Sequence, residues 1–200
     1  MIKKLIILVL LIIGGIIYWV NIIESKNFDL NLFEINSNLE KISENETSVI
    51  NKEIERETLK KFRIFYSDFS TDTINKYTKD LYNEDIYFID PLHQINGIDK
   101  VIKYFIKTAE PIKFCRFEIQ SIDNSNNHYY VRWNMFLISK VTPNKKIIAP
   151  GFTHFIMNQE GKIIFHQDFW DMSLLYDKLP VIGFWSKLVK GRILGNEISN

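Results

Sequence analysis

Apolar side chains recur at helical spacing in three segments between residues 59 and 106. The three stripes are Leu59, Phe62, Tyr66 and Phe69; then Ile74, Tyr77, Thr78, Leu81 and Tyr82; then Ile98, Val101, Ile102, Phe105 and Ile106. This period predicts three amphipathic helices with their apolar stripes on a common core. Proline disfavours a helical conformation in the residue before it. Asp90 precedes Pro91, so an extended segment over residues 86–89 separates the second helix from the third.

From residue 113 onward the apolar residues recur with a period of two. Runs rich in apolar and aromatic residues at 113–122, 128–139, 152–157 and 162–172 predict four strands, with turn-forming residues between them. Helices followed by consecutive strands predict an α+β fold, a curved antiparallel sheet with the helices on one face. The core residues expected from these patterns are Phe62, Tyr66, Ile102, Phe105, Phe155 and Ile164.

The last predicted strand carries the strongest candidate chemistry. Alternation along a strand places Ile164, His166, Asp168 and Trp170 on one face. An imidazole, a carboxylate and an indole then lie side by side among apolar neighbours. If this face points inward, it forms a ligand pocket with a few polar groups.

The turn at residues 158–161 determines which residues of the preceding strand lie opposite those of the last strand. Pairing Asn158 with Gly161 would place Thr153 opposite His166, on the same face. His154 then points to the other face of the sheet.

The amino terminus predicts a membrane anchor. Residues 5–23 carry no charge, Lys3 and Lys4 precede them, and Tyr18 and Trp19 lie near the far end. Nineteen helical residues span about 28 Å, close to the thickness of a bilayer's hydrocarbon core. The positive-inside rule then predicts a single-pass protein with a cytoplasmic amino terminus and an extracytoplasmic domain. We therefore divide the chain into an anchor (1–23), a polar linker (24–50), a domain (51–173) and a carboxyl-terminal amphipathic helix with a tail (174–200).

The composition of the chain limits the classes of partner and cofactor that it can bind. The net charge is +1, which gives no field for nucleic acid, and the single cysteine excludes an internal disulfide. We find no cofactor motif and expect no metal site. Near the carboxyl end, Ile182, Trp185, Leu188 and Val189 form an apolar stripe beside basic residues. This helix either lies on an anionic membrane surface or closes the open end of the domain.

Two stretches together resemble the NTF2-like superfamily, and within it SnoaL-like and ketosteroid-isomerase-like domains. They are YFIDPLHQINGIDKVIKYF at 87–105 and GFTHFIMNQEGKIIFHQDFW at 151–170. The resemblance covers about residues 57–172. It implies a cystatin-like cone, in which a bent sheet wraps around the helices and encloses an apolar pocket. It also implies that two copies often pair through their sheets, so a homodimer is expected.

The resemblance also implies site residues. Asp90 matches the catalytic base of the isomerase, and Tyr66 matches its tyrosine donor on the first helix. Thr153 stands where the isomerase has a protonated aspartate, so steroid isomerisation is not expected. The pocket positions of the last strand fall on His166, Asp168 and Trp170, and Phe155 and Ile164 complete the expected pocket wall.

Three functions remain open from the sequence. The first is a membrane-tethered domain that binds a small, largely apolar molecule. The second is an isomerase- or hydrolase-type enzyme that uses Asp90 with His166 and Asp168. The third is a non-catalytic interaction module, similar in layout to the scaffold subunits of type IV secretion machines. For each candidate residue a structural role stays open: Asp90 as a cap of the turn, and His166 with Asp168 as a polar patch that holds water.

Overall fold

The computed structural model describes residues 10–16, 18, 31–46, 49–179 and 181–194. The chain forms two compact units, Met1–Leu30 and Asn31–Asn200. In the first, residues 10–16 are helical, and most of the predicted anchor at 5–23 lies outside the described residues. Within the part that the structure describes, no helix is both long enough and apolar enough to cross a membrane.

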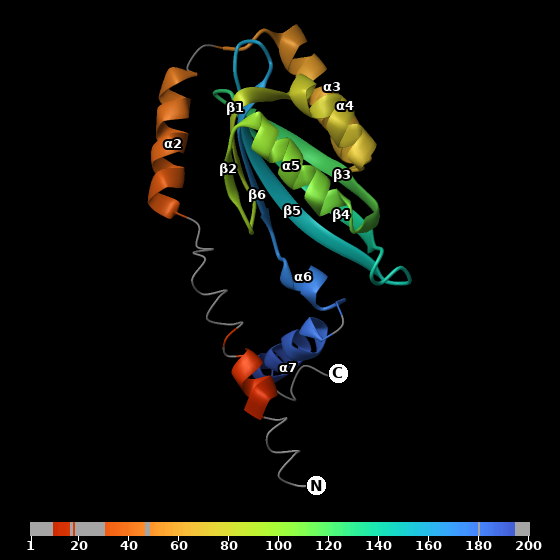
Figure 1. Cartoon of the computed structure of the whole chain (residues 1–200). Helices are drawn as coiled ribbons and strands as arrows, with labels where there is room; N and C mark the ends of the chain where they lie inside the picture. The colour runs from red at the N-terminus through yellow and green to blue at the C-terminus, as the bar shows by residue number, and fades with distance from the viewer. Residues whose placement is uncertain (1–9, 17, 19–30, 47–48, 180, 195–200) are drawn as a thin grey trace, which may run out of the picture. The chain divides into compact units, whose positions relative to one another are not determined.

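The second unit is an α+β domain built around one six-stranded sheet (Figure 1). The helices are α2 (Leu32–Asn45), α3 (Lys52–Ser67), α4 (Thr71–Leu81), α5 (Ile98–Ala109), α6 (Ser173–Tyr176) and α7 (Ile182–Leu194). The strands are β1 (Tyr82–Ile89), β2 (Gln94–Asn96), β3 (Ile112–Ser125), β4 (His128–Ser139), β5 (Lys146–Met157) and β6 (Ile163–Trp170). Helix α2 lies within the segment predicted as a polar linker.

The curved sheet has the order β2-β1-β6-β5-β4-β3. Strand β1 runs parallel to β6, so the sheet is mixed, and the prediction of a purely antiparallel sheet is wrong. The last strand therefore lies in the middle of the sheet, between β1 and β5. In Figure 1, α3, α4 and α5 lie along one face of the sheet, and α2 lies beside β2, away from α3 and α4.

The core between these helices and the sheet is mainly aromatic. Phe62, Tyr66, Phe105 and Phe155 are buried, as predicted, and Ile102 is partly buried against them. The prediction for Ile164 is wrong, because Ile163 occupies the core instead. A β-bulge between β5 and β6 causes this difference, since it interrupts the alternation next to the turn.

The turn and the bulge each shift the pairing of β5 with β6 by one residue. Thr153 lies opposite Asp168, and Phe155 lies opposite His166. The expected pairing of Thr153 with His166 is therefore wrong by two residues, a shift that keeps the same face. The carbonyl of Asn158 accepts a hydrogen bond from the backbone N–H of Gly161 at 2.9 Å, which closes the expected turn. The backbone N–H of Asn158, however, donates to the carbonyl of Lys162 at 2.9 Å, so the strand pairing starts one residue later than expected.

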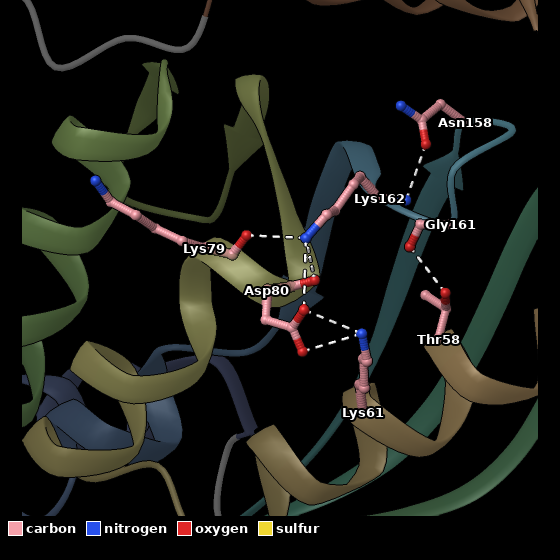
Figure 2. Close-up of polar contacts among 7 residues, drawn as sticks. All are labelled: Thr58, Lys61, Lys79, Asp80, Asn158, Gly161 and Lys162. Carbon is pink, nitrogen blue, oxygen red and sulfur yellow. Dashed lines mark hydrogen bonds and ion pairs between the residues drawn. The ribbon is translucent and has the colours of Figure 1, made fainter. Parts of the chain in front are cut away.

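This hairpin turn is fastened to the helices (Figure 2). The hydroxyl of Thr58 donates to the carbonyl of Gly161 at 2.8 Å. The Lys162 ammonium donates to the last carbonyls of α4, at 3.0 Å for Lys79 and 2.6 Å for Asp80. A cation at the negative end of a helix satisfies carbonyls that have no partner within the helix.

Gly161 is required at this turn for two reasons. Its φ is +77°, and a Cβ would lie 2.5 Å from the hydroxyl oxygen of Thr58. We expect Gly161→Ala to lower the free energy of unfolding by at least about 1–2 kcal/mol, the cost of a left-handed conformation in a residue with a side chain. Urea denaturation measures this loss.

Gly191→Ala is the matched control, because a Cβ at this helical glycine meets open space. It should be neutral or stabilise by up to about 1 kcal/mol. Equal effects of the two substitutions would contradict the account of the turn.

A histidine pair lies on the face of the sheet opposite α3. The Nδ1 atom of His128 lies 2.9 Å from Nε2 of His154, and His154 also stacks on Tyr130. Burial, reinforced by the nearby His128 and His166, lowers the pKa of His154 from 6.5 to about 4. In the folded chain this ring is therefore neutral at pH values where the unfolded chain protonates it.

We expect the domain to lose stability as the pH falls from about 6.5 to about 4, the window between these two pKa values. His154→Phe should reduce that loss, because phenylalanine keeps the ring contacts and takes up no proton. Urea denaturation across this pH window measures the difference, with Tyr130→Phe as the control that keeps both imidazoles. An equal loss in His154→Phe and the parent chain would contradict the assignment.

Candidate functional site

A cavity of about 360 Å³ lies between the helices and the concave face of the sheet. Its walls come from α3, α5, β1, β3, β4, β6 and the α6 region. The lining is mostly apolar, and its aromatic members are Tyr66, Phe69, Phe88, Tyr104, Phe105, Phe117, Trp133 and Trp170. The charged residues of the described lining are Asp90 and Asp168, and it contains no Lys, Arg or His.

Asp90 lies directly after β1, in the turn that the Asp-Pro pair forms. Its Oδ1 accepts hydrogen bonds from the backbone N–H groups of Leu92 and His93, each at 2.8 Å. Its Oδ2 accepts a short hydrogen bond from the hydroxyl of Tyr104 on α5. Burial raises the pKa of Asp90, the Tyr104 hydroxyl and the two amides lower it, and the nearby Asp168 raises it. Asp90 therefore both holds the turn and lines the cavity.

Asp168 projects from β6 to the cavity wall, and 17% of its side chain is exposed. Its Oδ1 accepts a hydrogen bond from the hydroxyl of Thr153 at 2.5 Å and lies 3.0 Å from Nε2 of His166. The indole N–H of Trp133 donates in turn to the Thr153 hydroxyl at 2.8 Å. Among the described residues, none donates to Oδ2 of Asp168, so this oxygen is free for a ligand.

His166 lies behind Asp168 and is completely buried, so it does not line the cavity. Since a carboxylate only accepts hydrogen bonds, the contact with Asp168 places a proton on Nε2. The hydroxyl of Tyr82 lies 3.3 Å from Nδ1 and 2.7 Å from the hydroxyl of Tyr66. Burial raises the pKa of both tyrosines, which keeps their hydroxyls protonated as donors.

These contacts form one buried chain of hydrogen bonds, which we call the polar chain. Its members are Trp133, Thr153, Asp168, His166, Tyr82 and Tyr66. Three of them, Trp133, Asp168 and Tyr66, also line the cavity. Because each link holds its neighbour, the polar chain fixes the direction in which Asp168 presents its free oxygen.

The predicted site residues divide into three groups. Tyr66, Asp90, Asp168 and Trp170 line the cavity. Thr153 and His166 contact Asp168 from behind it. Phe155 and Ile164 lie outside the lining, Phe155 in the core and Ile164 beside the bulge.

Two important residues were not predicted from the sequence. Trp133 could have been found, because alternation places it on the same face of its strand as Val131 and Met135, both of which are buried. Tyr104 lies beside the apolar stripe of α5 rather than in it, and no sequence pattern connects it with Asp90. The described residues contain no group of three or more His, Cys, Asp or Glu side chains arranged to hold a metal ion.

Solved structures show that this architecture is the NTF2-like fold. A hypothetical protein from Catenulispora acidiphila with a ketosteroid-isomerase-like fold, solved in complex with trimethylamine, has 14% identity and a TM-score of 0.53; the match covers 61% of this chain and 91% of that protein. A protein from Jannaschia sp. CCS1, named for its likeness to SnoaL-like polyketide cyclases, has 12% identity and a TM-score of 0.53, with 67% and 99% covered. An NTF2-like protein of unknown function from Burkholderia pseudomallei has 12% identity and a TM-score of 0.54, with 62% and 98% covered.

At these identities the likeness establishes the fold alone. No curated protein matches the chain. One family model does match, over residues 59–166, and its description is "Uncharacterized conserved protein (DUF2358)". This match runs from α3 to His166 and covers more than half of the protein. It includes Asp90 and every member of the polar chain except Asp168. The chain therefore belongs to the DUF2358 family of uncharacterized conserved proteins.

Proposed function

We propose that the domain binds a small molecule with an apolar body and one cationic or hydrogen-bond-donating end. The observation that carries this proposal is the aromatic cavity whose charged groups are two carboxylates. Aromatic faces attract cations, and a carboxylate with a free oxygen accepts a charge-assisted hydrogen bond. A bound cation would also relieve the repulsion through which Asp168 raises the pKa of Asp90.

One structural relative supports the ligand class. The Catenulispora acidiphila protein was solved with trimethylamine, a small amine with an apolar body. We propose a ligand of this kind for the present cavity, with its apolar part against Trp133 and Trp170 and its polar end toward Oδ2 of Asp168.

We also propose that residues 5–23 tether the domain to a membrane, with the amino terminus in the cytoplasm and the domain outside it. The uncharged run and the two lysines before it support this arrangement. The tether would keep the cavity near a source of apolar molecules.

Three probes with one ring and different charges test the ligand class. They are cyclohexylamine, cyclohexanol and cyclohexanecarboxylate, titrated into the full-length chain in nanodiscs by calorimetry at pH 7. We expect cyclohexylamine to bind about tenfold or more tightly than the carboxylate, since a hydrogen bond to a charged group contributes about 1.5–3 kcal/mol. Asp168→Asn should remove most of this preference, because the amide still accepts from Thr153 but carries no charge.

Asp123→Asn is the matched control, since Asp123 is an exposed carboxylate on β3. Trp170→Ala should weaken the binding of all three probes, because the indole is an apolar part of the cavity wall and carries no charge. Equal affinity for the amine and the carboxylate would contradict the proposal.

A second candidate function is proton abstraction from a carbon acid by Asp90. It is favoured by the position of this carboxylate in the cavity wall, where burial raises its pKa. The raised pKa makes Asp90 a stronger base than an exposed carboxylate.

Deuterium exchange next to the carbonyl of cyclohexanone, followed by NMR in D₂O, tests this candidate. We expect the parent chain to accelerate the exchange and Asp90→Asn to lower the rate by about 100-fold or more, a common size for the loss of a general base. Asp85→Asn, which alters an exposed carboxylate of β1, is the control. Exchange at the buffer rate in the parent chain would exclude this activity for simple ketones.

A further inference from the structure

Helix α7 contacts the rest of the domain through its polar side. The Ser186 hydroxyl donates to Oδ1 of Asp177 at 2.5 Å. The Lys190 ammonium donates to Oδ2 of Asp177 at 2.6 Å and to the Ser173 hydroxyl at 2.9 Å. Gly183 lies so close to Asp177 that a Cβ would approach its carbonyl oxygen to 2.7 Å. Polar groups and a glycine thus make this contact, where a surface helix normally uses its apolar stripe.

The apolar side of α7 is exposed as a result. The exposed fractions are 49% for Ile182, 65% for Phe184, 60% for Trp185, 41% for Leu188, 55% for Val189 and 78% for Ile193. At about 100° per residue these six side chains share one half of the helix surface with Arg192, and Ser186, Lys190 and Gly183 lie on the other half. Single exposed apolar residues are normal, but a contiguous group marks a surface that another body covers.

Helix α7 does not line the cavity, whereas Leu175 and Leu179 just before it do. The α6 region therefore provides the cavity wall here, and α7 lies on the outside of that region. This arrangement leaves the apolar side of α7 without a partner in the described part of the domain.

The positive charge of α7 favours an anionic bilayer over a second copy of the chain as the body that covers this surface. Residues 182–194 contain no acidic residue, and of their three basic residues Lys190 is paired with Asp177, whereas Lys187 and Arg192 are exposed. A second copy docked on the same surface would bring like charges together, which opposes a two-fold pair. An anionic bilayer attracts these charges, accepts the apolar side chains below its headgroups and suits an interfacial indole. The long side chain of Arg192 can reach lipid phosphates past its apolar neighbours.

We propose that α7 lies in the surface of an anionic phospholipid bilayer, with Phe184, Trp185 and Val189 among those side chains that enter it. This contact is separate from the tether at residues 5–23 and does not depend on the ligand of the cavity. It places the α6 wall of the cavity beside the lipid surface.

A spin label at Val189→Cys tests the proposal in the full-length chain reconstituted into vesicles. Burial raises the pKa of the native Cys115 thiol to about 12, so the label reacts with the introduced, exposed cysteine. Electron paramagnetic resonance then compares the collisions of the label with oxygen, which concentrates in lipid, and with a water-soluble nickel chelate. A label at Asp123→Cys on β3 is the control for a site in water.

We expect the label at residue 189 to favour oxygen in vesicles containing phosphatidylglycerol, and the label at residue 123 to favour the nickel chelate in all vesicles. Lys187→Gln and Arg192→Gln should each lower the ratio of immersed to free helix by about fivefold, the effect of one basic residue near an anionic surface. A label at residue 189 that stays in water would overturn the proposal. Dipolar broadening between two labels would overturn it in favour of a second copy.

Discussion

The domain depends on one constraint: polar groups placed in an apolar interior must have hydrogen-bond partners. The sheet and its helices bury a largely aromatic core, yet β6 carries an imidazole and a carboxylate into it. The polar chain meets this requirement, since His166 has a partner on each side and Thr153 links Trp133 with Asp168. An unpaired buried polar group would cost about 1–3 kcal/mol. The same bonds that satisfy these groups hold Asp168 at the cavity wall, so stability and the site share one set of contacts.

The helices and most strands follow from the sequence because local patterns determine them. Periods of 3.6 and 2 locate α3, α4, α5 and the strands from β3 onward. The parallel pairing of β1 with β6 does not follow, because it joins segments about eighty residues apart that no local signal connects. This pairing puts β6 in the middle of the sheet and places Phe88 beside His166. It explains why His166 is buried behind the cavity wall rather than exposed in it.

The candidate site also contains some features that local sequence patterns predict and others that depend on contacts between distant segments. Alternation along β6 places His166, Asp168 and Trp170 on one face, and the resemblance adds Asp90 and Tyr66; of these five, all but His166 line the cavity. The bulge in the last hairpin has no clear signal in the sequence, and it moves Ile164 out of the core. Together with the one-residue shift at the turn, it places Thr153 opposite Asp168. Tyr104 could not be predicted because its bond to Asp90 depends on how α5 packs against the end of β1. Side chains that meet across elements require the tertiary structure, while side chains on one strand do not.

We propose that the cavity binds a small molecule with an apolar body and one cationic or hydrogen-bond-donating end, such as an amine. A crystal structure of the chain grown with cyclohexylamine tests it most directly. We expect density for the ring between Trp133 and Trp170, with the amine nitrogen within hydrogen-bond distance of Oδ2 of Asp168. A cavity without the probe, or one closed by movement of Tyr104 and Trp170 into it, would contradict the account.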